Sequence, residues 1–263
     1  MSRPHTAPSR ALWPSLVRRA AAGLVPVLAL ALTGCGGSSS DAAGAETETG
    51  EPFEESPLPT IGLGSDLGAI SGSTELRSID TGEVDSIVMI GDSITVGATP
   101  HLEERFAAMG FDDVAISAQN SKRIGMSFGD NASGADIASF VAAAREGDPA
   151  HTLWVIALGT NDAGQYDGSD EVATVVDEVL AAVPTEAPVI WIDTYFEDRL
   201  DGSEMVNAAI EQQLRERGNA TIGRWSVIAP SDGVLVSDGV HTTDGGAVVF
   251  ADLVATTVAD FLQ

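Results

Sequence analysis

Cysteine and basic residues are scarce in this sequence. It holds one cysteine, Cys35, in 263 residues, and 13 Lys and Arg stand against 39 Asp and Glu, for a formal net charge of −26. A single thiol excludes an intramolecular disulfide framework and any zinc site built on a Cys-x-x-Cys pair. The acidic balance argues against a nucleic-acid partner, because binding to a phosphate backbone needs clustered Lys and Arg. We interpret most of the acidic residues as solvated surface.

Aromatic residues are also few, at 5% of the chain, which gives little sign of a wide lipid-binding surface. Hydrophobic residues nevertheless make up 44%, too many for a disordered chain, so a packed core can form. The length suits one domain of ordinary size with appendages, or at most two small domains.

The N-terminus is basic and then apolar. Residues 1–34 contain four Arg and no acidic residue, and an apolar run of 13 residues, 20–32, follows the last Arg. Together with the small residues after it, this pattern predicts an export signal, and the run is too short for a comfortable transmembrane helix.

The end of this signal, Leu32-Thr33-Gly34-Cys35, resembles a bacterial lipobox. The resemblance implies cleavage before Cys35 and a diacylglyceryl thioether on its sulfur. Such a lipid would tether the exported protein to the outer face of the cell membrane. The alternative is an ordinary signal in which Cys35 is incidental.

The segment after the lipobox is rich in Gly, Ser, Glu and Pro and lacks apolar periodicity. It cannot bury enough surface to offset the entropy of ordering. We therefore predict a lipoprotein signal peptide at residues 1–34, a lipidated Cys35 with a flexible acidic linker at 35–80, and one folded domain at 81–263.

In that domain, short apolar runs alternate with segments of helical periodicity. The expected strands are residues 87–90, 114–116, 153–158, 189–192 and 225–229. Five strands that alternate with helices predict an α/β fold, a three-layer α/β/α sandwich around a five-stranded parallel sheet. The chemistry of such sheets gathers beyond the carboxyl ends of the strands.

Two polar motifs follow expected strands. Gly91-Asp92-Ser93 comes directly after the first strand, where a tight turn into a helix exposes a serine hydroxyl and its N–H. Asn161, in Gly-Thr-Asn-Asp after the third strand, can donate to a developing oxyanion. Taken alone, each motif is equally consistent with a helix cap or an Asx turn.

A third motif, Asp238-Gly239-Val240-His241, precedes the last helix. His241 can take a proton from Ser93, and Asp238 can bond the other imidazole nitrogen and stabilise the imidazolium. The alternative is a helix-entry turn with a surface histidine.

The content and order of the three motifs resemble the SGNH/GDSL hydrolase family over residues 84–263. The resemblance implies a flavodoxin-like SGNH hydrolase fold, with Ser93 as nucleophile, His241 as base, Asp238 as its orienting acid and Asn161 in the oxyanion hole. Asp92 matches the Asp of the family motif and is a candidate for shaping the turn or contacting substrate. The layout of Trp191, Asn207 and Trp225-Ser226 resembles actinobacterial members.

One block departs from the family pattern. After the second strand the family usually has a Gly whose N–H joins the oxyanion hole, but this chain has Ser-Ala-Gln-Asn-Ser-Lys-Arg-Ile-Gly at residues 117–125. A backbone N–H does not require Gly, so either Ser121 or Lys122 can supply the donor, and Ser121 is the candidate that we name for the oxyanion hole. Arg123 resembles the Arg in the same block of peptidoglycan O-acetyltransferase-like members, which makes it a substrate-binding candidate.

These observations predict an extracytoplasmic serine esterase that acts on a short acyl group and needs no metal or organic cofactor. Its partners would be an ester-bearing small molecule, glycan or lipid, and the membrane through the lipid anchor. The alternatives are a lipid or lysophospholipid esterase, a peptidoglycan or polysaccharide O-acyltransferase, and an inactive surface module that binds glycans.

Overall fold

The computed structural model describes residues 84–263. The predicted signal peptide, Cys35 and the linker therefore lie outside the described residues. Among the helices of residues 84–263, none is long and apolar enough to cross a membrane.

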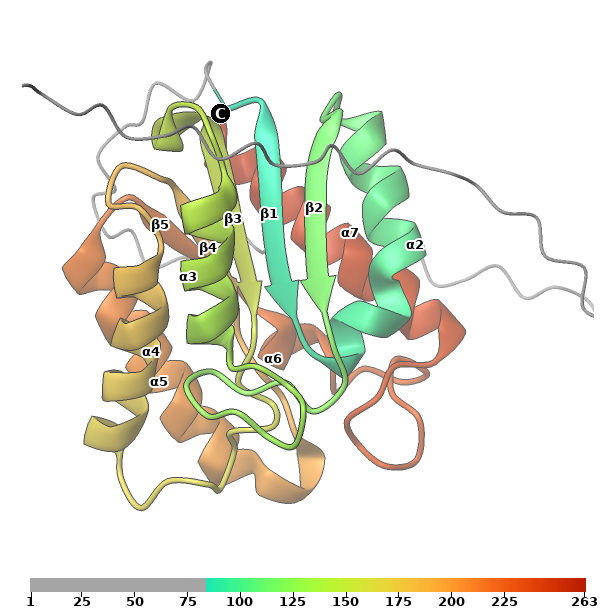
Figure 1. Cartoon of the computed structure of the whole chain (residues 1–263). Coiled ribbons are helices and arrows are strands. Elements are labelled where there is room, and N and C mark those ends of the chain that lie inside the picture. The colour runs from blue at the N-terminus through green and yellow to red at the C-terminus, as the bar shows by residue number, and fades with distance from the viewer. Residues whose placement is uncertain (1–83) are drawn as a thin grey trace, which may run out of the picture. The chain divides into compact units, whose positions relative to one another are not determined.

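The centre of the fold is a five-stranded sheet in which every neighbouring pair is parallel (Figure 1). The strand order is β2-β1-β3-β4-β5. β1, β3 and β4 are buried along their whole length, as expected for strands covered on both faces. The strands are β1 Ser86–Gly91, β2 Asp113–Ala118, β3 Thr152–Ala157, β4 Val189–Ile192 and β5 Ala220–Gly223.

Helices cover both faces of this sheet, which gives the three predicted layers (Figure 1). α2 and α7 pack on one face, and α3, α4 and α5 pack on the other. The main helices are α2 Ser93–Ala108, α3 Gly134–Ala144, α4 Ser169–Ala182, α5 Leu200–Arg217 and α7 Asp244–Phe261. Shorter turns are the 3₁₀ helices η2 Pro149–His151 and η3 Glu197–Arg199, and the four-residue helix α6 Trp225–Ile228.

The alternation of side chains along each strand divides the core into two clusters. In β1, Met89 belongs to the cluster under α2 and α7, whereas Val88 belongs to the cluster under α3, α4 and α5. Both side chains are at most 1% exposed. The continuous apolar runs of the sequence arise because each central strand must fill two cores at once.

The predicted α/β/α fold is confirmed, and four of the five predicted strands overlap observed ones. The fifth prediction was wrong: residues 225–229 contain α6, and β5 lies a few residues earlier. The carboxylate of Asp193, just after β4, accepts hydrogen bonds from the N–H and the hydroxyl of Ser226, both at 2.7 Å, and this holds the segment in a helical turn. An apolar run of this length does not distinguish a buried strand from a short buried helix.

The start of α7 is held against the loop that precedes it. Thr243 caps the helix, because its hydroxyl oxygen accepts from the N–H of Gly246 at 2.9 Å, and its own N–H donates to the carbonyl of Val234 at 3.0 Å. A Cβ on Gly246 would lie 1.9 Å from the Val234 carbonyl oxygen, whereas a Cβ on Gly245 would meet nothing closer than 3.8 Å. The close approach of two backbone segments therefore requires glycine at position 246.

We expect Gly246→Ala to lower the free energy of unfolding by about 1–3 kcal/mol, because the added methyl group must push the backbone around Val234 away from the helix. The adjacent Gly245→Ala is the matched control, and it should leave stability unchanged or raise it by up to about 1 kcal/mol. Denaturant midpoints of the two variants, measured side by side, test this. Equal midpoints would contradict the proposed backbone contact.

Candidate active site

Ser93 is the first residue of α2 and directly follows the turn that ends β1. Asp92 is the N-cap of this helix, and its Oδ1 accepts from the N–H of Ile94 at 3.0 Å. The N–H groups of a first helical turn have no partner within the helix, and they carry the positive end of its dipole. Ser93 therefore has its hydroxyl and its own N–H at a place that favours a developing negative charge.

The three residues predicted to form a triad are joined by hydrogen bonds. Ser93 Oγ lies 3.0 Å from His241 Nε2, and His241 Nδ1 lies 2.7 Å from Asp238 Oδ2. The other carboxylate oxygen of Asp238 accepts from the N–H groups of Val240 and His241, both at 2.9 Å. An ionised Asp238 can only accept a hydrogen bond, so the proton lies on His241 Nδ1. Nε2 is then free to accept a hydrogen bond from the Ser93 hydroxyl.

The acid and the base of this group are open to solvent: the side chains of His241 and Asp238 are 52% and 50% exposed. The hydrogen bond from the His241 ring is the main cause that lowers the pKa of Asp238 to about 2, and the backbone N–H groups add to it. Asp238 therefore stays ionised over the whole range in which histidine titrates.

Asn161 lies in the loop after β3 and reaches between the other two strand-end loops. Its Nδ2 is 3.1 Å from the carbonyl of Lys122, after β2, and 3.4 Å from Asp92 Oδ2, after β1. The shorter bond fixes the amide plane. The longer contact, with Asp92, is weak, so the second amide hydrogen of Asn161 is available to a ligand.

The loop between β2 and α3, residues 119–133, presents the second predicted donor. Ser121 has a φ of 60°, in the left-handed region that favours glycine and that other residues seldom adopt. The N–H of Lys122 is already bonded to the carbonyl of Gln119 at 3.3 Å. Within residues 84–263 the N–H of Ser121 has no such acceptor, so of the two candidates Ser121 is the one with a free donor.

The two substrate-binding candidates, Arg123 and Asp92, lie in different environments. Arg123 remains within its own loop, with Nη1 3.3 Å from the sulfur of Met126 and the guanidinium 5.2 Å from the ring centre of Phe128. Asp92 is 2% exposed and acts as the cap of α2, and burial is the main cause that raises its pKa to about 7. Contact of either residue with substrate stays a prediction.

Two side chains of the site were given no role in the sequence analysis, which considered Lys122 only as a backbone donor. Asp162, beside Asn161, is fully buried, and its carboxylate accepts from the N–H of Ile124 at 3.1 Å and from the hydroxyl of Tyr166 at 2.9 Å. Burial is the main cause that raises its pKa to about 6. Lys122 is also buried. The position of Asp162 next to Asn161 was a usable signal, whereas nothing in the sequence indicates that Lys122 is buried.

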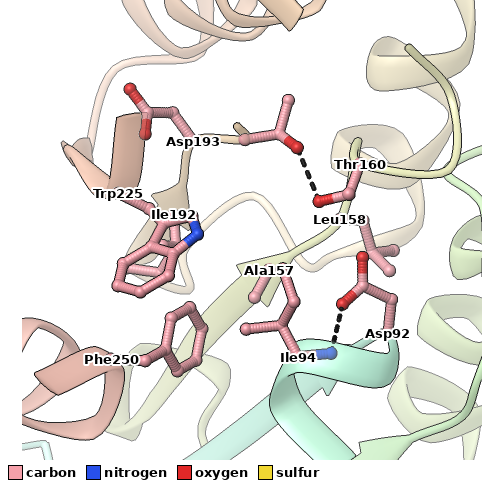
Figure 2. Close-up of a pocket in the computed structure, with 10 residues that line it drawn as sticks. Asp92, Ile94, Ala157, Leu158, Thr160, Ile192, Asp193, Trp225 and Phe250 are labelled. Carbon is pink, nitrogen blue, oxygen red and sulfur yellow. Dashed lines mark hydrogen bonds between the residues drawn. The ribbon is translucent and has the colours of Figure 1, made fainter. Parts of the chain in front are cut away.

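A small pocket lies at the strand ends, lined by residues that follow β1, β3 and β4 (Figure 2). Figure 2 shows Asp92 bonded to the N–H of Ile94 at one side of the pocket and Thr160 at another. The hydroxyls of Thr160 and Thr194, which also lines the pocket, are bonded to each other at 2.6 Å. The pocket has room for about one water molecule, too little for an acyl chain. Among the residues of the described domain, no group of His, Cys, Asp and Glu side chains could hold a metal ion.

The sequence matches no protein-family model and no curated protein significantly. Solved structures do match. A carbohydrate acetylesterase family member from Sinorhizobium meliloti gives a TM-score of 0.54 at 16% identity, over 67% of this chain and 99% of that one. The aryl esterase of M. smegmatis gives 0.53 at 15% identity, over 68% and 100%. A member of the lipolytic protein G-D-S-L family from Veillonella parvula gives 0.51 at 19% identity, over 66% and 98%. The chain therefore has the fold of the GDSL/SGNH hydrolases.

We expect His241→Ala to raise the pKa of Asp238 from about 2 toward its ordinary value of 3.8, because the largest stabilising hydrogen bond of the carboxylate is lost. The pKa should stay below 3.8, since two backbone N–H groups still donate to it. A native pKa below the unfolded value stabilises the fold above about pH 4, and this stabilisation disappears as the pH falls toward 2. The variant should therefore lose less stability than the wild type over that interval.

Carboxyl-carbon NMR titration measures the Asp238 pKa directly. His101→Ala, on α2, is the control, because that histidine has no hydrogen bond to Asp238. An Asp238 pKa that is the same in wild type and His241→Ala would contradict the hydrogen bond between the two side chains.

Proposed function

We propose that this protein is a serine esterase that removes a short acyl group, with Ser93 as nucleophile, His241 as general base and acid, and Asp238 as the group that orients it. The observation that carries the proposal is the unbroken hydrogen-bonded chain from Ser93 through His241 to Asp238. A surface module without activity has no need of this alignment, and Ser93 and Asn161 lie beyond the carboxyl ends of parallel strands, where ligands of such sheets bind.

In the proposed reaction, Ser93 Oγ attacks the acyl carbonyl carbon while its proton passes to His241 Nε2. The oxyanion accepts hydrogen bonds from the N–H of Ser93, the N–H of Ser121 and the side chain of Asn161. The intermediate collapses as His241 gives its proton to the leaving alcohol. Water then attacks the acyl-enzyme, with His241 again as base, and releases the acid and free Ser93.

The substrate that we favour is a small acyl group on a bulky alcohol such as a carbohydrate. The open flank of the site supports this, because half-exposed triad side chains can be reached by a large substrate. A structural neighbour described as a carbohydrate acetylesterase is consistent with it. If a sugar hydroxyl takes the place of water in the second step, the same site transfers the acyl group.

Exposed apolar side chains on elements that carry site residues support a second candidate, an ester of a lipid or another apolar group. Val96 lies on the first turns of α2, Val236 donates its N–H to the carbonyl of His241, and Phe128 projects from the β2–α3 loop. All three are exposed, Phe128 by 55%. An apolar acyl chain or alcohol could bury part of this surface.

Hydrolysis of p-nitrophenyl acetate, butyrate and octanoate by the full-length chain tests both candidates. We expect turnover to fall at least about 1,000-fold in Ser93→Ala, because the nucleophile is lost. Ser127→Ala is the matched control, since this exposed serine bonds to Asp136 and should keep full activity. Faster turnover of acetate than of octanoate would favour the small acyl group, and the reverse order would favour the lipid ester. Equal rates for wild type and Ser93→Ala would contradict the esterase.

We further propose that the protein is an exported lipoprotein, on the basis of the lipobox that ends at Cys35. Cys35→Ser in the full-length chain should move the protein from washed membranes to the soluble fraction without loss of turnover, because the only thiol is removed and the domain is unchanged. Fractionation followed by the esterase assay measures both effects. Retention of Cys35→Ser in the membranes would argue against the lipid anchor.

A further inference from the structure

Lys122 is a buried lysine for which the proposed mechanism has no use. Its side chain is 1% exposed, and within residues 84–263 no carboxylate lies within ion-pair distance of its ammonium group. Burial lowers its pKa. Taking an ammonium group out of water without a counter-charge is unfavourable, so stability alone gives a poor reason for lysine at this position.

The ammonium group joins the two ends of the β2–α3 loop. Nζ donates to the carbonyl of Ala132 at 3.3 Å and to the side-chain oxygen of Gln119 at 3.5 Å. A second hydrogen bond also links the two ends of the loop, from Asn131 Nδ2 to the carbonyl of Asn120 at 2.6 Å. The far end of the loop is thus docked on the four residues that follow β2.

Those residues carry the second half of the proposed oxyanion hole. Ser121, with its left-handed φ of 60°, immediately precedes Lys122. The carbonyl of Lys122 accepts from Asn161 Nδ2 at 3.1 Å and so sets the plane of that amide. Lys122 is therefore joined to both donors through its backbone, since it follows Ser121 in the chain and its carbonyl holds the Asn161 amide, while its side chain bonds to Ala132 and Gln119.

We propose that Lys122 is a positioning residue for the oxyanion hole: its buried ammonium group holds residues 119–122 against Ala132 and thereby keeps the Ser121 N–H and the Asn161 amide directed at the acyl oxygen. The inference rests on the esterase proposed above. Lys122 does not touch the reacting atoms, and its effect passes through the two donors that do.

The test compares Lys122→Met, which keeps the chain length without the charge, with Lys122→Arg, which restores a donor. Gln119→Ala removes one acceptor of the ammonium group at an exposed position. Ser127→Ala removes a hydrogen bond on the outer side of the same loop and is the matched control. The kcat and KM for p-nitrophenyl acetate are measured for each, together with thermal midpoints and the affinity for a trifluoromethyl ketone that mimics the tetrahedral intermediate.

We expect Lys122→Met to lower kcat about 100-fold and the affinity for the trifluoromethyl ketone in parallel, with KM nearly unchanged, because a displaced donor is missed only when the oxyanion forms. Lys122→Arg should recover part of kcat, Gln119→Ala should lose several-fold, and Ser127→Ala should match the wild type. A Lys122→Met enzyme that keeps the wild-type kcat would overturn the inference. So would a loss of kcat that leaves the affinity for the trifluoromethyl ketone intact.

Two further outcomes also test the inference about Lys122. If Lys122→Met does not fold, Gln119→Ala carries the test, and wild-type kcat in that variant would overturn the inference. If the wild type shows no turnover that depends on Ser93, the esterase proposal itself fails and this inference with it. If Lys122→Met keeps the turnover of the wild type, the inference about Lys122 fails and the esterase proposal is unaffected.

Discussion

The register of β1 between its two neighbours determines where the site lies. Gly91, the last residue of β1, pairs with Ala118 at the end of β2 and with Ala157 at the end of β3. Three parallel strands thus stop at the same level, and the loops that follow them start side by side. The helix-entry turn with Ser93, the segment with Ser121 and the loop with Asn161 meet there without any long connection.

Buried carboxyl groups then hold these loops in place. Asp92 after β1, Asp162 after β3 and Asp193 after β4 each accept a backbone N–H from a turn or loop at this edge of the sheet. Burial is the main cause that raises their pKa values, to about 7, 6 and 6. A carboxyl group whose native pKa lies above its unfolded value stabilises the fold most at low pH and less as the pH rises through the native pKa. This loss of stability near neutral pH is offset, because without these carboxyl groups the backbone N–H groups would be buried without acceptors.

The parts of this arrangement that could be predicted are those that depend on local pattern. The continuous apolar runs located four strands, and the strand ends then located Ser93 and Asn161. β5 was missed because its sequence, Ala-Thr-Ile-Gly, is half-exposed at its centre and gives little apolar signal, whereas Trp225 and Ile228 in α6 are buried. The burial of Lys122 depends on Ala132 and Gln119 closing over it, which is a tertiary contact with no sequence signature.

The base stands apart from the sheet edge, yet its position is well determined. Gly239, with a φ of +67°, turns the chain between Asp238 and His241. Its carbonyl accepts from the N–H of Glu197 at 3.0 Å and its N–H donates to the carbonyl of Val236 at 3.1 Å. The turn is thus held from η3 and from the loop before α7, although the side chains that it presents are half in water. Because the His241 and Asp238 side chains are half-exposed, solvent reaches the proposed base, which agrees with the proposed hydrolysis.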